Sequence, residues 1–517
     1  MLDRISSEIL LQIIPFLTPS DYNRCVLVCK DWYTVFIPYL YHHVSLPLND
    51  YCHISYPRVP NSLVPVRRFA QVIIQNPSLA PLVRSLELYP SDCRGKWLQL
   101  PPLAPVAEEQ YRHFMLPHGE TRLRHRRKFH AWRRDLKEAS ERREDQRVLF
   151  HYEDAWLALL LVQVRNLEKL GIALPEERWI LGFYDGPTPP KNSPHLEQVI
   201  EWARHPKLGV LTQLKHISLK NGPCLWECEH AVNAVPLTRL LPFLRIPSLR
   251  KLYVKNPCDR SPPSVSQDLS TIPLTHLDFE APEEGLPNLP RLLERCTDLQ
   301  SFTLQQNGWS DKYSHCWQDL PRVYRSLQRS RFSIRHLNVT FRDCCLWQDP
   351  KTPTPVFFGP LSDFPRLESV HIRWGNLLPF LENRAHTPVT PLWELLPSSL
   401  RHLFIDHCLL ACSSALYTEL KTLLIHYPTH VPFLRTLYLR LAKEREEAGS
   451  TPNDPSTWRP ISPDPTTHDR LHALREDFRA LSIDFRIFQS DEDVNFGQEY
   501  YIRKKWPWGQ HGKIMTL

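Results

Sequence analysis

Glycine is scarce in this chain, which has only 15 glycines among 517 residues. Tight phosphate-binding loops and sharp nucleophile turns need glycine, because its backbone adopts conformations that other residues avoid. The sequence contains no phosphate-binding glycine loop, no nucleophile elbow and no metalloprotease helix motif. We therefore expect a protein that is not an enzyme, with no catalytic residues and no cofactor.

Long apolar runs are also missing. The longest, Trp156–Val162, is far shorter than the ~20 residues that a helix needs to span a bilayer. Glu8, Gln12 and Pro15 interrupt the only early apolar run, so we expect no signal peptide. The sequence predicts a soluble protein with no membrane partner.

The 13 cysteines form no short paired framework, which predicts reduced thiols and a cytoplasmic or nuclear protein. Two groups contain residue types that bind zinc, namely Cys224, Cys228 and His230, and His402, His407, Cys408 and Cys412. Neither group has the paired spacing of a zinc finger. We predict structural thiols and no metal site.

Residues 5–41 predict three short helices. Apolar residues recur at helical spacing in the first, at Ile5, Ile9, Ile13, Phe16 and Leu17. Ser20 and Asp21 are the expected caps of a second helix that carries Cys25, Val28 and Cys29. A third is expected after Asp31, with Trp32, Phe36 and Leu40. So small a core favours docking onto a partner.

This stretch resembles the F-box. Its motif stands here as Ile5-Ser6-Ser7-Glu8-Ile9-Leu10, Ile13-Ile14-Pro15-Phe16-Leu17, Asp21-Tyr22 and Val28-Cys29-Lys30-Asp31-Trp32. Ser6 replaces the usual proline and Ile14 the usual aromatic residue. The resemblance implies binding to a Skp-type adaptor, and through it to a cullin ligase, by Ile5, Ser6, Ile9, Leu17, Val28, Cys29 and Trp32. The alternative is a generic helical cap on a repeat domain.

One short phrase recurs eleven times from residue 83 onward: apolar, two variable residues, apolar, one variable residue, apolar. It begins as Val83-Leu86-Leu88, continues through units such as Leu214-Ile217-Leu219 and Leu434-Leu437-Leu439, and ends as Phe478-Leu481-Ile483. Helical patterns lie between the phrases, for example in residues 291–296, 323–327 and 415–425. Such recurrence is typical of a solenoid, and the unit is similar to the leucine-rich repeat. The alternative is an irregular α/β fold with a parallel sheet.

The fold class we predict is α/β, a small three-helix F-box followed by a leucine-rich-repeat-like solenoid with parallel strands. We expect an F-box at residues 1–46, a connecting segment at 47–81, the solenoid at 82–490 and a terminal cap at 491–517. The cap would use Tyr500, Tyr501, Trp506 and Trp508 to cover the last repeat. Residues 444–469 are expected to form an inserted loop.

Alternation along each strand predicts three rows of side chains on the concave face of the solenoid. The first row is Lys169, His216, Lys251, His276, His336 and His402; the second is Tyr253, Asp278, His371, Phe404 and Tyr438. The third is Lys220, Lys255, Glu280, Arg373, Asp406, Arg440 and Asp484. Mixed aromatic and charged residues suit protein recognition, so we expect a protein substrate to bind His216, Lys251, Tyr253, His276, His336, His371, Arg373, His402, Phe404 and Tyr438.

The histidines of the first row recur in alternate repeats, ~10 Å apart, so they cannot share one metal ion. They leave open a binding face that responds to pH. A solvated face without a ligand is the plainer alternative.

Residues 121–147 hold eleven Arg and Lys against five Asp and Glu, a net charge of +6 in a chain whose total is +7. Phe129, Trp132, Leu136 and Ala139 form an apolar seam, which predicts a solvated helix docked by that seam. Nuclear import or nucleic-acid binding is the alternative interpretation of the charge. The function that the resemblance implies is a substrate-recognition adaptor of a Skp–cullin–F-box ubiquitin ligase; the alternative is a repeat scaffold without a ligase role.

Overall fold

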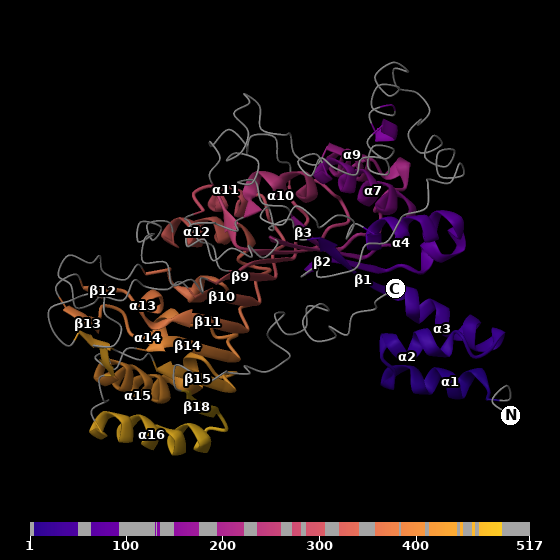
Figure 1. The fold of residues 1–517 in the computed structure, drawn as a ribbon. Coiled ribbons are helices and arrows are strands. Elements are labelled where there is room, and N and C mark those ends of the chain that lie inside the picture. Colours follow the sequence, from indigo (N-terminus) through magenta and orange to yellow (C-terminus); the bar gives the residue numbers. More distant parts are fainter. Residues whose placement is uncertain are drawn as a thin grey trace. The chain divides into compact units, whose positions relative to one another are not determined.

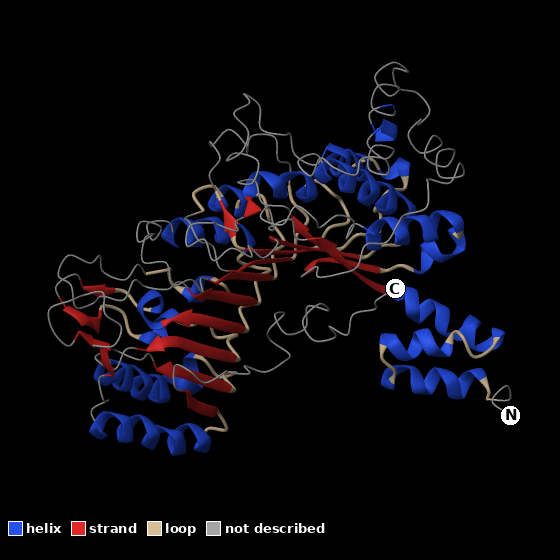
Figure 2. Ribbon diagram, in the orientation of Figure 1, coloured by secondary structure: helices blue, strands red, loops and turns tan. Residues whose placement is uncertain are grey.

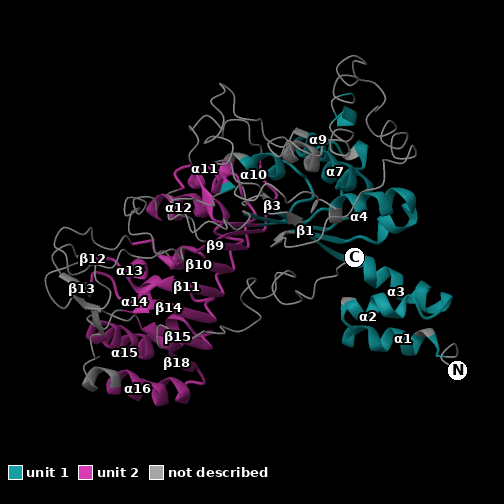
Figure 3. Ribbon diagram, in the orientation of Figure 1, with its two compact units in different colours: residues 1–235, 239–252, 506–517 teal, residues 236–238, 253–505 magenta. Residues whose placement is uncertain are grey.

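A computed structural model describes residues 5–49, 64–91, 130, 132–134, 149–174, 194–221, 235–259, 271–280, 286–305, 320–340, 357–381, 384–408, 413–441, 445–447, 458–460 and 465–488. The chain divides into two compact units (Figure 3). Unit 1 comprises residues 1–235, 239–252 and 506–517, and unit 2 comprises residues 236–238 and 253–505. Each unit is described below by itself.

Twelve strands form one sheet in the order β1-β2-β3-β4-β6-β8-β9-β10-β11-β14-β15-β18. Their bounds are β1 (His43–Asn49), β2 (Ser85–Ser91), β3 (Lys169–Leu174), β4 (His216–Asn221), β6 (Lys251–Lys255), β8 (His276–Glu280), β9 (Ser301–Gln305), β10 (His336–Thr340), β11 (Ser369–Arg373), β14 (His402–Cys408), β15 (Thr436–Leu441) and β18 (Asp484–Phe488). Neighbours follow each other in chain order and pair in parallel, as β1 does with β2 and β14 with β15. This is a solenoid-like α/β fold, as the recurring phrase predicts.

Helices return the chain between strands (Figures 1 and 2). After the N-terminal helices they are α4 (Val64–Gln75), α7 (Leu149–Gln163), α9 (Pro194–Ala203), α10 (Leu237–Leu244), α11 (Leu289–Leu293), α12 (Leu320–Leu327), α13 (Trp374–Leu377), α14 (Leu392–Leu395), α15 (Ser413–His430) and α16 (Pro465–Ala480). Three short two-stranded pairs complete the described strands: β5 (Val235–Pro236) with β7 (Pro257–Cys258), β12 (Phe380–Leu381) with β13 (Arg384–Pro388), and β16 (Arg445–Glu447) with β17 (Trp458–Pro460).

The strands bury every second residue against the helices. Leu437 and Leu439 of β15 are fully buried, and Leu403 and Ile405 occupy the same register positions on β14. Successive side chains of a strand point to opposite faces, so the residues between these apolar positions lie on the other face of the sheet. We call this second surface the helix-free face.

The last repeat differs from the prediction. Leu437 and Leu439 of β15 pair with Phe485 and Ile487, not with Leu481 and Ile483. Phe478 belongs to α16, and Ser482 has a positive φ of 61° that turns the chain into β18. Asp484 consequently pairs with Thr436 and belongs to the first row rather than the third.

The structure also bears on the predictions made for the segments toward the two ends of the chain. Residues 444–469 contain the β16–β17 pair and the first turn of α16, so the segment is not a plain loop. The sequence also missed β1, which pairs with β2 and begins at His43, inside the range expected for the F-box. The proposed cap at 491–517 lies outside the described residues.

The N-terminal module consists of α1 (Ser7–Ile13), the 3-10 turn η2 (Ile14–Phe16), α2 (Pro19–Cys25) and α3 (Lys30–His42). Thr18, not Ser20 or Asp21, is the N-cap of α2; its hydroxyl accepts from the Asp21 amide, and the Asp21 carboxylate accepts from the Thr18 amide. This reciprocal pair is a capping box, with Asp21 at the third helical position. The second helix ends at Cys25, so Val28 precedes α3 and Cys29 is its N-cap.

Candidate functional site

The N-terminal module has a small core and a large apolar surface. Leu10, Ile14 and Phe36 are buried at its centre, and Trp32 packs on Phe36 with ring centroids 5.7 Å apart. Of the eleven large hydrophobic residues exposed in the described chain, seven belong to this module: Ile9, Leu11, Phe16, Leu27, Val28, Tyr33 and Tyr39. So many in one small module indicate a surface that binds another protein.

The residues assigned to adaptor binding by their positions in the F-box motif form two groups that differ in solvent exposure. Ile9 is 53% exposed and Val28 46%, and Ser6 is also exposed. Ile5, Leu17, Cys29 and Trp32 are half-buried. The exposed members are free to contact a partner, whereas Ile5, Leu17 and Trp32 pack against the module's own core.

Sequence reasoning missed the two most exposed apolar residues of the module. Phe16 is 84% exposed and Leu27 is 80% exposed. Helical spacing placed Phe16 on the buried face, but the chain leaves the α-helix at Ile13 and η2 carries Phe16 outward. Leu27 lies in the turn between α2 and α3, where helical spacing of apolar residues cannot be used to predict which side chains are buried. Pro15 lies inside the predicted helix, and it was the signal in the sequence that the α-helix ends before Phe16.

The rows predicted on the repeats follow the register of the sheet. In unit 2, His276 pairs with Ser301, which pairs with His336, and the row continues through Ser369 and His402 to Thr436. In the second row, His371, Phe404 and Tyr438 are neighbours on β11, β14 and β15. Tyr253 also lies in unit 2, whereas Lys169, His216 and Lys251 occupy the first row of unit 1.

A buried aromatic and charged cluster occupies the helix-free face of β11, β14 and β15. The His371 ring stacks on Phe404 with centroids 4.3 Å apart, and the Arg440 guanidinium lies over the same ring at 5.3 Å. The predicted contact residues on these strands are almost fully enclosed, namely His371, Arg373, His402, Phe404 and Tyr438; Phe404 is 1% exposed. Aromatic pairs across neighbouring strands stabilise a sheet, so this stack supports the pairing of β11 with β14.

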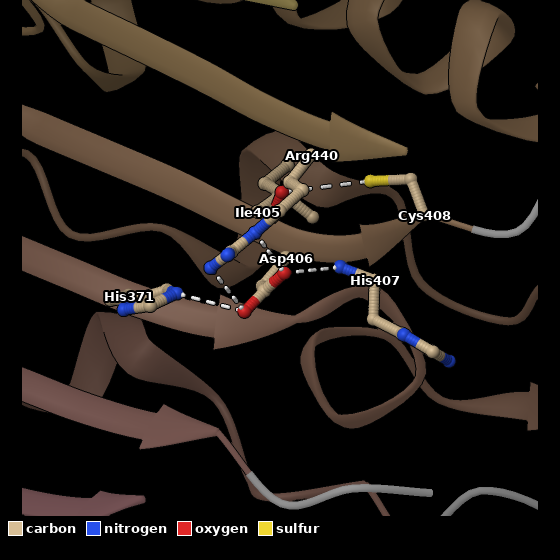
Figure 4. Close-up of polar contacts among 6 residues, drawn as sticks. All are labelled: His371, Ile405, Asp406, His407, Cys408 and Arg440. Carbon is tan, nitrogen blue, oxygen red and sulfur yellow. Dashed lines mark hydrogen bonds and ion pairs between the residues drawn. The ribbon is translucent and has the colours of Figure 1, made fainter. Parts of the chain in front are cut away.

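Asp406 is the polar centre of this cluster (Figure 4). Its carboxylate accepts from His371 Nε2 at 3.2 Å, from Arg440 Nε at 2.9 Å and Nη2 at 3.0 Å, and from the His407 amide at 2.7 Å. Burial opposes ionisation, but the His371 hydrogen bond and the charges of Arg440 and Arg373 hold the pKa of Asp406 well below its usual range. His407 has a positive φ of 54°, which lets its amide turn toward this carboxylate.

At the same strand end, Cys408 makes a contact with the main chain. The Cys408 thiol is fully buried and donates to the Ile405 carbonyl at 3.6 Å (Figure 4). The β14–β15 register shifts between Ile405 and Cys408, so this contact satisfies a carbonyl where the ladder is interrupted. This contact gives the Cys408 thiol a structural role at the end of β14.

The histidines of the first row are poorly suited to sense pH near neutrality. Burial, followed by nearby cations, lowers the pKa of His216 to about 4 and that of His402 to about 4. Burial also lowers the pKa of His336 and His371. His216 and His402 therefore remain neutral between pH 6 and 8, so these two rings do not give the face a response to pH in that range.

The lowered histidine pKa values predict acid destabilisation. Below about pH 6.5 the unfolded chain takes up protons on His216 and His402, which the folded chain accepts only near pH 4. We expect the melting temperature to fall as the pH is lowered from 7 to 5. Thermal denaturation should show a smaller fall in the His216→Gln/His402→Gln variant; an equal fall in both proteins would contradict this origin.

The basic segment contributes one described anchor. Trp132 is buried in unit 1, donates from Nε1 to the Ala155 carbonyl at 3.0 Å and stacks on Trp202 at 6.0 Å. This contact with α7 and α9 agrees with a segment docked by an apolar seam. Phe129, Leu136 and Ala139 lie outside the described residues.

The described residues contain no group of three histidine, cysteine or acidic side chains arranged to hold a metal ion. Cys224, Cys228, His230 and Cys412 lie outside them. Within the same part of the chain, no helix combines the length and the apolar character that crossing a membrane requires.

Two family models match the sequence. The model described as leucine-rich repeat domain covers residues 56–450, and the model described as F-box-like covers residues 7–47. No curated protein matches the chain. The first match contains strands β2 to β15, and the second contains the helical module and most of β1. Domains of these two kinds are typical of non-catalytic adaptors.

Proposed function

Because the chain belongs to the leucine-rich repeat family over residues 56–450 and opens with an F-box-like domain, we propose that it is a substrate-recognition adaptor of a Skp–cullin–F-box ubiquitin ligase. The single observation that carries the proposal is the exposed apolar surface of the F-box-like module. F-box domains in general bind the Skp adaptor, and that adaptor joins them to the cullin.

The exposed residues give the docking a physical basis. Ile9, Leu27 and Val28 present apolar side chains to solvent, while Leu10, Ile14 and Phe36 hold the helices together beneath them. Covering exposed apolar area contributes roughly 25 cal/mol per Å². A partner that covers these residues stabilises both itself and the module.

The helix-free face of the repeats is the proposed contact surface for a protein target. Its candidates in unit 2 are His276, His336, His371, Arg373, His402, Phe404, Tyr253 and Tyr438, and in unit 1 they are His216 and Lys251. The target's lysines would be held near a ubiquitin-conjugating enzyme, so that catalysis comes from proximity and from no residue of this chain. The free thiols of the described residues fit a cytoplasmic or nuclear protein.

Affinity capture tests the ligase role. Tagged full-length chain is expected to retain both the Skp adaptor and a cullin, and a chain that begins at His43 is expected to retain neither. Truncation at residue 42 removes α1 to α3 but spares β1, which pairs with β2 in the sheet. Retention of the adaptor without a cullin would contradict the ligase role, and equal retention by both chains would contradict the assignment of the F-box.

A further inference from the structure

Three lysines gather on the helix-free face of unit 1. Lys169 pairs in register with His216, and the Lys251 amide bonds to the Lys215 carbonyl at 2.9 Å, which places Lys251 beside His216 on the next strand. Lys220 lies four residues after His216 on the same strand and face. Lys169 and Lys251 thus flank one histidine, ~5 Å away on either side.

Two of these cations, Lys169 and Lys251, have no acidic partner among the described residues, whereas Lys220 faces the carboxylate of Glu87. On this face of β1 to β4, Glu87 is the only carboxylate among the described residues; it accepts a hydrogen bond from the Ser45 hydroxyl at 3.5 Å, and the charge of Lys220 acts to lower its pKa. Among the described residues, no ion pair joins Lys169 or Lys251 to a carboxylate. Burial and then Lys169 lower the pKa of Lys251, while burial, Lys251 and Lys169 lower that of His216. The fold therefore holds like charges together at a cost in stability.

A second observation, independent of charge, points to a ligand. The Ser218 hydroxyl lies on the same face, between His216 and Lys220; it is 1% exposed and has no hydrogen-bond partner. A buried hydroxyl without a partner costs free energy, and such groups are rare in folded proteins. Its neighbour in register on β3 is Gly171, and the atoms closest to a Cβ built there all belong to Glu87. No β3 side chain therefore covers the hydroxyl.

We propose that Lys169, Lys251, His216 and Ser218 form a subsite for a phosphate monoester group. The ligand must be an anion because the lysines have no acidic partner, and it must accept several hydrogen bonds because ammonium, imidazole and hydroxyl donors meet there. A phosphate monoester has about two negative charges and three acceptor oxygens, which match this set better than a single carboxylate does. Only the source of the phosphate rests on the proposed function: an adaptor would take it from a phosphorylated target.

The stability of variants separates a binding role from a merely structural one. Ser218→Ala removes an unpartnered buried hydroxyl, so we expect an unchanged or higher melting temperature together with a several-fold loss of phosphate binding. Lys169→Gln/Lys251→Gln relieves like-charge repulsion, so we expect it to be at least as stable as the wild type and to lose phosphate binding tenfold or more. Lys207→Gln/Lys421→Gln, which alters two exposed lysines, is the matched control.

The test uses purified full-length chain and two probes. The first is an array of peptides with a central serine that is phosphorylated, unmodified or replaced by glutamate; the second is inorganic phosphate, followed by thermal shift against chloride at equal ionic strength. We expect retention of phosphorylated peptides, lost in the Lys169/Lys251 variant and kept in the control. Stabilisation by inorganic phosphate without peptide retention would support the site and assign it to a free small phosphate.

Two results would overturn the proposal. One is retention or stabilisation that is the same in the Lys169/Lys251 variant as in the control, and the other is the absence of any response to either probe. Neither result bears on the F-box, because capture of the Skp adaptor is measured separately and should be unaffected by all of these substitutions. Loss of adaptor capture by the wild type would overturn the proposed function and leave the phosphate subsite standing.

Discussion

Introducing aspartate at Ile9 and Val28 together is expected to weaken capture of the Skp adaptor about 100-fold or more, with little change in melting temperature. Both side chains are exposed, so a charge there disturbs neither the Leu10–Ile14–Phe36 core nor the packing of Trp32. Each introduced carboxylate would have to lose its hydration in the complex. The residues that dominate binding near the centre of an interface contribute ~2 kcal/mol or more to the binding free energy. Quantitative pull-down with purified adaptor measures the effect.

Phe332→Asp is the matched control for this variant. Phe332 is 61% exposed, so it too is an exposed apolar residue replaced by a charge, but it lies in unit 2 and outside the F-box-like module. Adaptor capture should be unchanged by it. If the two variants captured the adaptor equally well, Ile9 and Val28 would not belong to the docking surface. Leu27→Asp extends the test to the residue that the sequence motif did not indicate.

Replacing Asp406 with alanine is expected to destabilise unit 2 by about 3 kcal/mol. The carboxylate accepts from His371, Arg440 and the His407 amide, and its removal leaves Arg440 and Arg373 without their shared counter-charge in a buried setting. Because two units need not unfold together, hydrogen exchange on β11, β14 and β15 is a better measure than one melting temperature. Those strands should lose protection.

Asp298→Ala provides the comparison, because Asp298 is an exposed aspartate of the same unit whose described hydrogen bond comes only from the adjacent Thr297. It should leave exchange in β11, β14 and β15 unchanged. Undiminished protection of these strands in Asp406→Ala would show that the stacked rings of His371 and Phe404 hold the face together without the carboxylate.

The sequence was most informative about the strands, where a single rule decides which residues are buried. Apolar residues must alternate with other residues along a strand that buries one face, so the apolar positions at Leu437 and Leu439, and their equivalents in other repeats, located both the strands and the helix-free face. The sequence failed at the ends of the array. At β18 the turn at Ser482, which has a positive φ, places the strand after the apolar positions that the recurring phrase predicted. At β1 the first apolar position of the phrase would be Tyr41, which is still part of α3.

The candidate sites show a similar division. The sequence predicted which side chains share the helix-free face, because register follows from alternation. It gave no sign that Asp406 would draw His371 and Arg440 together, because those contacts depend on rotamers and on the turn at His407. Nor did it identify Ser218 or separate the exposed Phe16 from the buried Leu10, because burial depends on where each helix stops.

The central claim is that the helical module at the N-terminus docks onto a Skp adaptor, and titration calorimetry of purified adaptor into the full-length chain tests it most directly. We expect one adaptor per chain, submicromolar affinity and the negative heat-capacity change that accompanies burial of apolar surface. No binding to a chain whose circular dichroism shows it to be folded would contradict the account.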